Sequence, residues 1–175
     1  ASGDLTRRKL VPALFSLHCK GRLPGDLRIV GFARRPYDDA RFRELMQDGV
    51  KEFAPDHYTA AAWSDFEQSL HYGQGDLGAD EDFKTLDTRL SALEGGPSDR
   101  VYYSSVAPCF EEWMVEHLGG CAMAREKAGY RRVIIEKPFG SDLVTATALN
   151  ETVQRVFDES QIYRIDHYLG KETAQ

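Results

Sequence analysis

Apolar residues along the chain recur at two spacings, one typical of buried strands and one typical of helices. Short apolar runs predict strands at residues 27–32, 100–108, 131–140 and 161–166, and a weaker one in "LHYGQGD", residues 70–76. Apolar residues spaced three or four apart predict helices, or helical stripes, at residues 4–20, 42–53, 63–70, 83–93, 109–129 and 141–158. This alternation predicts an α/β fold, doubly wound, with a mostly parallel sheet.

Local signals refine several of these elements. Pro12 lies inside the first helix and should bend it, because proline lacks an N–H and crowds the preceding turn. Asp38 or Asp39 is the expected N-cap of the second helix, and Ser141 or Asp142 that of the last.

Composition excludes some classes of protein. The 175 residues carry a net charge of -6, which disfavours a general nucleic-acid binder. No apolar run approaches the roughly 20 residues that cross a membrane, so we expect no membrane partner. The cysteines are three in number and lack C-x-x-C spacing, which indicates reduced thiols in a cytoplasmic protein rather than a disulfide or zinc framework; we expect no metal site.

The chain opens with "ASGDLTRRKL", in which Ser2 and Gly3 precede a helix expected to start at Asp4. In dinucleotide-binding folds a strand runs into a glycine turn and then a helix whose N-terminus faces the pyrophosphate. The stretch is typical of the back half of such a turn, with the preceding strand and first glycine missing from the sequence. Taken alone, however, Ser-Gly-Asp before a helix is usually just an ordinary N-cap.

Arg34 and Arg35 follow the strand at residues 27–32, where an NAD-binding protein usually has an acid. A guanidinium group suits a phosphate monoester, so the pair permits NADP without excluding NAD. The alternative is a solvated arginine pair on a loop.

The strands at residues 131–140 and 161–166 each run directly into polar groups. Lys137 stands at the end of the first, and "RIDHYLGKE" brings Asp166, His167, Tyr168 and Lys171 after the second. Two cationic groups and a phenol would suit a phosphate monoester, whereas a lone Asp-His pair is usually a loop cap with a surface histidine.

Five segments in order resemble the coenzyme-binding domain of the glucose-6-phosphate dehydrogenase family. They are "SGDLTRRKLVPALF", "IVGFARRP", "YYSSVAP", "VIIEKPFG" and "QIYRIDHYLGKE". The resemblance covers essentially the whole chain, and the last segment is highly specific. One departure is Ala107, where many members have a proline.

The resemblance implies a coenzyme site for NADP, with NAD possible. The residues it assigns to the coenzyme are Ser2, Gly3, Asp4, Leu5, Arg34, Arg35, Ala107, Pro108 and Lys137. Arg34 would hold the adenosine 2′-phosphate, with Arg35 in support, and the residues from Ser2 to Leu5 would line the other phosphates.

The resemblance also implies the reaction, NADP-dependent oxidation of glucose 6-phosphate to 6-phosphoglucono-1,5-lactone, which opens the pentose phosphate pathway. His167, Tyr168, Lys171 and Lys137 would bind the sugar phosphate. Asp166 and Lys137 are the catalytic assignments; Asp166 would pair with a histidine that acts as the general base.

In the family that histidine lies in a second, β+α domain, which also carries the homodimer or homotetramer interface. We therefore expect residues 1–175 to be an incomplete dinucleotide-binding domain without dehydrogenase activity of its own. Two alternatives remain: a sugar dehydrogenase of the glucose–fructose oxidoreductase type, which shares "EKP", and a non-catalytic nucleotide-binding module.

Overall fold

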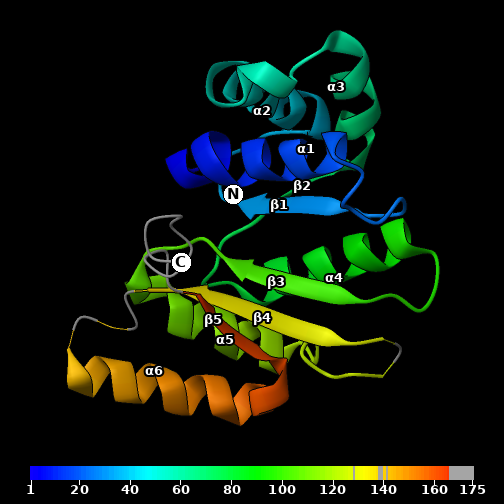
Figure 1. Ribbon diagram of the computed structural model, residues 1–175. Coiled ribbons are helices and arrows are strands. Elements are labelled where there is room, and N and C mark those ends of the chain that lie inside the picture. Colours follow the sequence, from blue (N-terminus) through cyan, green and yellow to red (C-terminus); the bar gives the residue numbers. More distant parts are fainter. Residues whose placement is uncertain (128, 138–139, 141, 166–175) are drawn as a thin grey trace. The chain divides into compact units, whose positions relative to one another are not determined.

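A computed structural model of the chain describes residues 1–127, 129–137, 140 and 142–165 (Figure 1). The contacts divide the chain into two compact units, Ala1–Asp76 and Leu77–Gln175. Every strand pairing among the described residues is parallel. The α/β class and the parallel pairing predicted from the alternating pattern are thus confirmed.

The first unit is a parallel pair of strands covered by helices. Strand β1 (Ile29–Ala33) pairs with β2 (Leu70–Gln74), with Gly31 opposite Tyr72. Figure 1 shows α1 lying along this pair, with α2 and α3 beyond it. The helices are α1 (Val11–Cys19), α2 (Asp39–Phe53) and α3 (Ala60–Phe66).

Side chains from all three helices and β2 form the core of this unit. Its buried members are Val11, Phe15, Phe42, Met46, Val50, Trp63, Phe66, Leu70 and Tyr72. Five of the nine are aromatic, and rings such as Phe15 and Phe66 meet edge to face, with their centroids 5.4 Å apart. Leu70, which the pattern placed both at the end of a helical stripe and at the start of a weak strand, begins β2, because a 3-10 turn at Glu67–Ser69 ends the helix.

The bend predicted at Pro12 stays a prediction, but the helix before this residue contains a π-helical turn. Thr6–Leu10 is π-helical and runs directly into α1, in which Pro12 lies in the first turn. A wider turn relieves the clash between a proline ring and the carbonyl four residues earlier. Residues 4–19 are therefore helical, one residue short of the predicted 4–20, and the helix just before the proline is of the π type.

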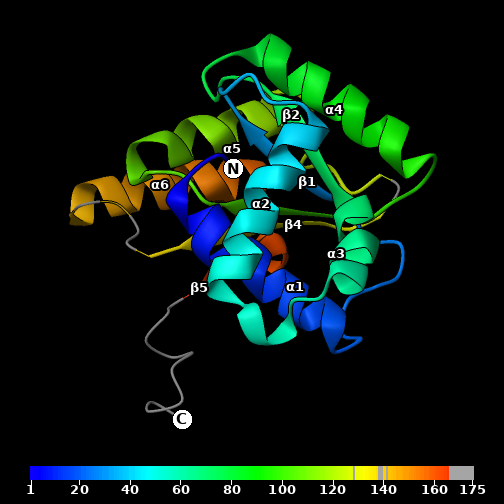
Figure 2. The same ribbon diagram turned by 90° about the horizontal axis from the view of Figure 1, so that it is seen from above.

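The second unit has three parallel strands, in the order β3, β4, β5. Its strands are β3 (Arg100–Ser104), β4 (Arg131–Glu136) and β5 (Ile162–Ile165). Its helices are α4 (Asp80–Glu94), α5 (Glu111–Gly120) and α6 (Leu143–Val156). Helix α5 contacts both α4 and α6, and it runs beside α6 in both views (Figures 1 and 2).

Several predicted elements in this unit were too long, among them the strand expected at residues 131–140, which ends at Glu136. The strand expected at residues 100–108 ends at Ser104, where its pairing with Ile135 ends, and Pro108–Phe110 is a 3-10 turn. The helix expected at residues 109–129 is α5 alone, which stops at Gly120 and is followed by Ala122 with a positive φ of 56°. Paired glycines and a left-handed residue end a helix although apolar residues continue beyond it.

Candidate functional site

The start of the chain lies against the carboxyl end of β1. The amino group of Ala1 donates a hydrogen bond to the carbonyl of Phe32 at 2.8 Å. Residues 2–5 at the helix start and Arg34 and Arg35 after β1 therefore flank the same strand end. This brings the two predicted halves of the coenzyme phosphate site together at the edge where α/β sheets bind ligands.

The helix start offers backbone donors and open space. The first N–H groups of a helix have no acceptor within the helix, so they can bind an anion. A Cβ built on Gly3 would meet nothing within 4 Å, so the chain leaves room in front of this residue. Asp4 is exposed and its carboxylate forms an ion pair with Arg8 at 3.1 Å, which offsets its charge; Leu5 is half-buried.

Arg34 and Arg35 begin the arginine loop, residues 34–37. The Arg34 guanidinium is exposed, and it lies 3.9 Å from the carboxylate of Asp76. The Arg35 guanidinium donates to the hydroxyl of Tyr37 at 3.0 Å, and this hydrogen bond raises the pKa of Arg35. Both cations thus stand in solvent beside β1, where each can contact an anion.

The site residues predicted in the second unit also share one sheet edge. Ala107 and Pro108 are exposed in the turn that follows β3, and Lys137 is exposed just after β4. The backbone N–H of Lys137 donates to the carbonyl of Ile165 at 3.3 Å, so β4 and β5 stay together to this point. Since the strands are parallel, their carboxyl ends meet at this edge.

Four of the predicted residues cannot be placed. Asp166, His167, Tyr168 and Lys171 lie outside the described residues. Ile165, the last residue described, is at the carboxyl end of β5.

A buried polar cluster near this edge was missed by the sequence analysis. The Tyr103 hydroxyl donates to the carboxylate of Glu136, the residue before Lys137. Glu111, at the start of α5, is 2% exposed, and its Oε2 atom has no hydrogen-bond partner among the described residues; the same holds for the Oγ atom of Ser104. The only sequence signal was an acid at the start of an otherwise apolar helix face.

The environment of Glu111 favours its protonated form. Burial, together with repulsion from the carboxylate of Glu136, raises the pKa of Glu111 to about 7. Burial and the hydrogen bond to Glu136 also raise the pKa of Tyr103, so its hydroxyl remains a donor.

Replacing Glu111 with glutamine should stabilise the chain at pH 8 and have little effect at pH 5. The folded chain holds a proton between pH 4.5 and about 7 that the unfolded chain has released. Stability is therefore lost as the pH rises through this window, by at most about 3 kcal/mol. Urea unfolding at both pH values measures the difference; the exposed Glu151→Gln change is the control. Equal effects of Glu111→Gln at the two pH values would contradict the prediction.

The motifs and the geometry agree with a comparison to known families. A family model described as "Glucose-6-phosphate dehydrogenase, NAD binding domain" matches residues 1–175. The chain belongs to this family. The resemblance inferred from the five segments is confirmed, and the family description implies a nicotinamide dinucleotide as the coenzyme.

Individual members of the glucose-6-phosphate dehydrogenase family align with the whole chain. Glucose-6-phosphate 1-dehydrogenase of Chlamydia pneumoniae is 37% identical over 182 residues, which cover 100% of this chain and 36% of that protein. The cytoplasmic glucose-6-phosphate 1-dehydrogenase 6 of Arabidopsis thaliana is 38% identical, and the match covers 100% of this chain and 35% of that protein. The chain thus spans about a third of the length of these relatives.

Solved structures agree with this assignment. A structure of glucose-6-phosphate dehydrogenase in complex with its substrate glucose 6-phosphate has a TM-score of 0.87 and 34% identity, covering 98% of this chain and 36% of that one.

In the part of this chain that the structure describes, no helix is long and apolar enough to cross a bilayer.

Proposed function

We propose that the full-length protein oxidises D-glucose 6-phosphate to 6-phosphoglucono-1,5-lactone and uses NADP as the hydride acceptor. Membership of the glucose-6-phosphate dehydrogenase family supports the reaction. The observation that supports NADP is the exposed Arg34–Arg35 pair at the end of β1, beside the start of a helix. By analogy with the Arabidopsis relative, we place the protein in the cytoplasm.

The residues of the first unit fit a dinucleotide with a 2′-phosphate. Ser2, Gly3, Asp4 and Leu5 would hold the pyrophosphate with backbone N–H groups, and the open space at Gly3 admits it. Arg34 would contact the 2′-phosphate, exchanging its long ion pair with Asp76 for a charge-assisted hydrogen bond. Arg35 would support it from the same loop.

The residues of the second unit would bind and orient the sugar. Lys137 would contact a sugar hydroxyl, His167, Tyr168 and Lys171 would hold the phosphate, and Ala107 and Pro108 would lie near the coenzyme. Asp166 would orient a histidine of the remaining polypeptide, which takes the proton of the anomeric hydroxyl. The nicotinamide, when bound, accepts the hydride.

Steady-state turnover of the full-length protein tests this function. We expect reduction of NADP with glucose 6-phosphate, and much weaker turnover with unphosphorylated glucose. Preference for free sugars would instead indicate an oxidoreductase of the glucose–fructose type, and binding of NADP without turnover of any sugar a nucleotide-binding module.

Replacing Arg34 with alanine should raise the KM for NADP by about tenfold or more, because a charge-assisted hydrogen bond contributes about 1.5–3 kcal/mol. The KM for NAD, which has no 2′-phosphate, should stay within about twofold. The control is Arg28→Ala at the opposite end of β1, where the guanidinium donates to the carbonyl of Asp26. An equal rise of both KM values would place the 2′-phosphate elsewhere.

A further inference from the structure

The backbone of the arginine loop is held by residues at the end of β2. Three consecutive carbonyl groups, those of Ala33, Arg34 and Arg35, accept hydrogen bonds from this strand end. The backbone N–H of Gly75 donates to Ala33 at 3.0 Å, and the Gln74 amide donates to Arg34 at 3.4 Å. We name Tyr72, Gln74 and Gly75 the β2 clamp.

Tyr72 makes the central contact of the β2 clamp. Its hydroxyl oxygen lies 2.9 Å from the carbonyl oxygen of Ala33 and 2.8 Å from that of Arg35, so one proton is shared between two acceptors. The same Arg35 carbonyl accepts the backbone N–H of Tyr37 at 2.8 Å. The chain therefore turns away from β1 around the hydroxyl of one tyrosine.

Tyr72 is itself rigidly placed. Its side chain is in the core, with the residue 3% exposed, and its ring packs against those of Phe42 at 5.2 Å and Tyr37 at 5.6 Å between centroids. Its backbone N–H donates to the carboxylate of Asp39 in the first turn of α2, at 2.7 Å. Burial raises the pKa of Tyr72, so the phenol remains a hydrogen-bond donor at neutral pH.

Both arginine side chains depend on this backbone. Arg35 donates to the hydroxyl of Tyr37, and the Tyr37 ring packs on that of Tyr72. Arg34 points toward Asp76, two residues beyond Gln74. A long cationic side chain binds an anion more tightly when the backbone that carries it is already in the binding conformation, because less conformational entropy is lost on binding.

We propose that Tyr72 is a positioning residue for coenzyme selectivity: through the β2 clamp it holds Arg34 and Arg35 where they meet the 2′-phosphate. The inference rests on the proposed function, in which these arginines bind NADP. Without the hydroxyl, the arginine loop samples other conformations. The apparent affinity for the 2′-phosphate then falls in proportion to the fraction of molecules whose loop is in the binding conformation.

Tyr72→Phe tests the role of the hydroxyl, because the ring that packs in the core is kept. Calorimetric titration of the full-length protein with 2′,5′-ADP and with 5′-AMP separates the 2′-phosphate from the rest of the adenosine half. We expect the affinity for 2′,5′-ADP to fall about three- to tenfold, as for the loss of one hydrogen bond, with that for 5′-AMP unchanged within about twofold. In turnover, the KM for NADP should rise while kcat and the KM for NAD stay constant.

Two further variants sharpen the test. Tyr102→Phe is the matched control, since the Tyr102 hydroxyl also donates to a backbone carbonyl, that of Met123 at 2.9 Å, but in the second unit. It should leave both affinities unchanged. Gln74→Ala removes an exposed member of the clamp and should shift selectivity in the same direction as Tyr72→Phe without disturbing the core.

The outcomes separate this inference from the proposed function. If the unaltered protein binds 2′,5′-ADP no better than 5′-AMP, the assignment of NADP fails. If it discriminates, but Tyr72→Phe discriminates equally well, the positioning role is overturned. A uniform loss of affinity for both nucleotides would also overturn it, since that is the effect of a purely structural tyrosine.

Discussion

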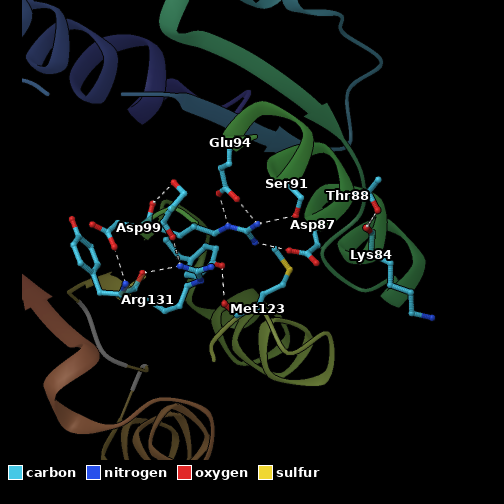
Figure 3. A network of polar contacts seen from close by, with 12 residues as sticks. Lys84, Asp87, Thr88, Ser91, Glu94, Asp99, Met123 and Arg131 are labelled. Atoms are coloured by element: carbon cyan, nitrogen blue, oxygen red, sulfur yellow. Dashed lines mark hydrogen bonds and ion pairs between the residues drawn. The ribbon is translucent and has the colours of Figure 1, made fainter. Parts of the chain in front are cut away.

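Replacing Arg100 with leucine should lower the free energy of unfolding by about 3 kcal/mol, at the lower end of the range for breaking a buried ion pair. Arg100 begins β3, and its side chain is 8% exposed. Figure 3 shows Asp87, Ser91 and Glu94 of α4 joined by dashed lines to one guanidinium group. The distances from that group of Arg100 are 2.5 Å to Asp87, 3.2 Å to Ser91 and 2.6 Å to Glu94.

The loss is large because leucine would leave carboxylates without their counter-ion. Burial alone would lower the pKa of Arg100, but the hydrogen bonds that its guanidinium donates to the carboxylates of Glu94 and Asp87 raise the pKa by more, so the group stays charged. Asp87 is 42% exposed and can be hydrated, whereas Glu94 is 13% exposed and cannot be hydrated as fully. Most of the penalty therefore falls on Glu94.

Urea unfolding of the chain measures this effect. The control is Lys84→Ala on the same helix (Figure 3), because its exposed ion pair with Glu81 should contribute less than about 1 kcal/mol. Adding Glu94→Leu to Arg100→Leu should restore part of the lost stability, since no buried carboxylate is then left unpaired. Equal losses in the Arg100 and Lys84 variants would show that the network stabilises nothing beyond an exposed pair.

Local chemistry made much of the fold predictable from the sequence. Asp38 and Asp142 were among the expected caps, and each accepts the backbone N–H three residues later, from Arg41 at 2.7 Å and from Thr145 at 2.8 Å. Such caps can be predicted because the acceptor and the donor lie within one helical turn of each other in the sequence. The parallel pairing followed from the alternation of strands and helices, which is also a property of the linear sequence.

Features that depend on distant residues could not be predicted in this way. An aromatic residue in a strand is usually assigned to the core, and Tyr72 is there, but its hydroxyl meets carbonyls 39 and 37 residues away in the chain. The end of β3 was misjudged for a related reason: the apolar pattern continues past Ser104, whereas the pairing with β4 does not. Glu111 resembles an exposed acid until α5 is packed, and only then is it buried.

Replacing Lys137 with glutamine in the full-length protein should lower kcat/KM for glucose 6-phosphate on the order of 100-fold or more, largely through kcat. Lys137 is exposed at the carboxyl end of β4, one residue after Glu136, whose carboxylate accepts the Tyr103 hydroxyl. In the proposed reaction, negative charge develops on the sugar oxygen as the anomeric hydroxyl loses its proton. In the proposed site, the Lys137 ammonium would stabilise this charge more in the transition state than in the ground state; glutamine, one atom shorter, keeps a hydrogen-bond donor without the charge.

The kinetic pattern distinguishes this role from simple binding. A rise in KM with kcat unchanged would mean that Lys137 contacts substrate and transition state equally, and would contradict a catalytic role. Arg132→Gln is the control, because it removes a cation from the other end of β4, where Arg132 pairs with Glu126. Its kcat/KM should stay within about twofold of the unaltered protein. Since the backbone N–H of Lys137 donates to Ile165, the glutamine variant keeps the β4–β5 contact, and a loss of activity then reports on the charge.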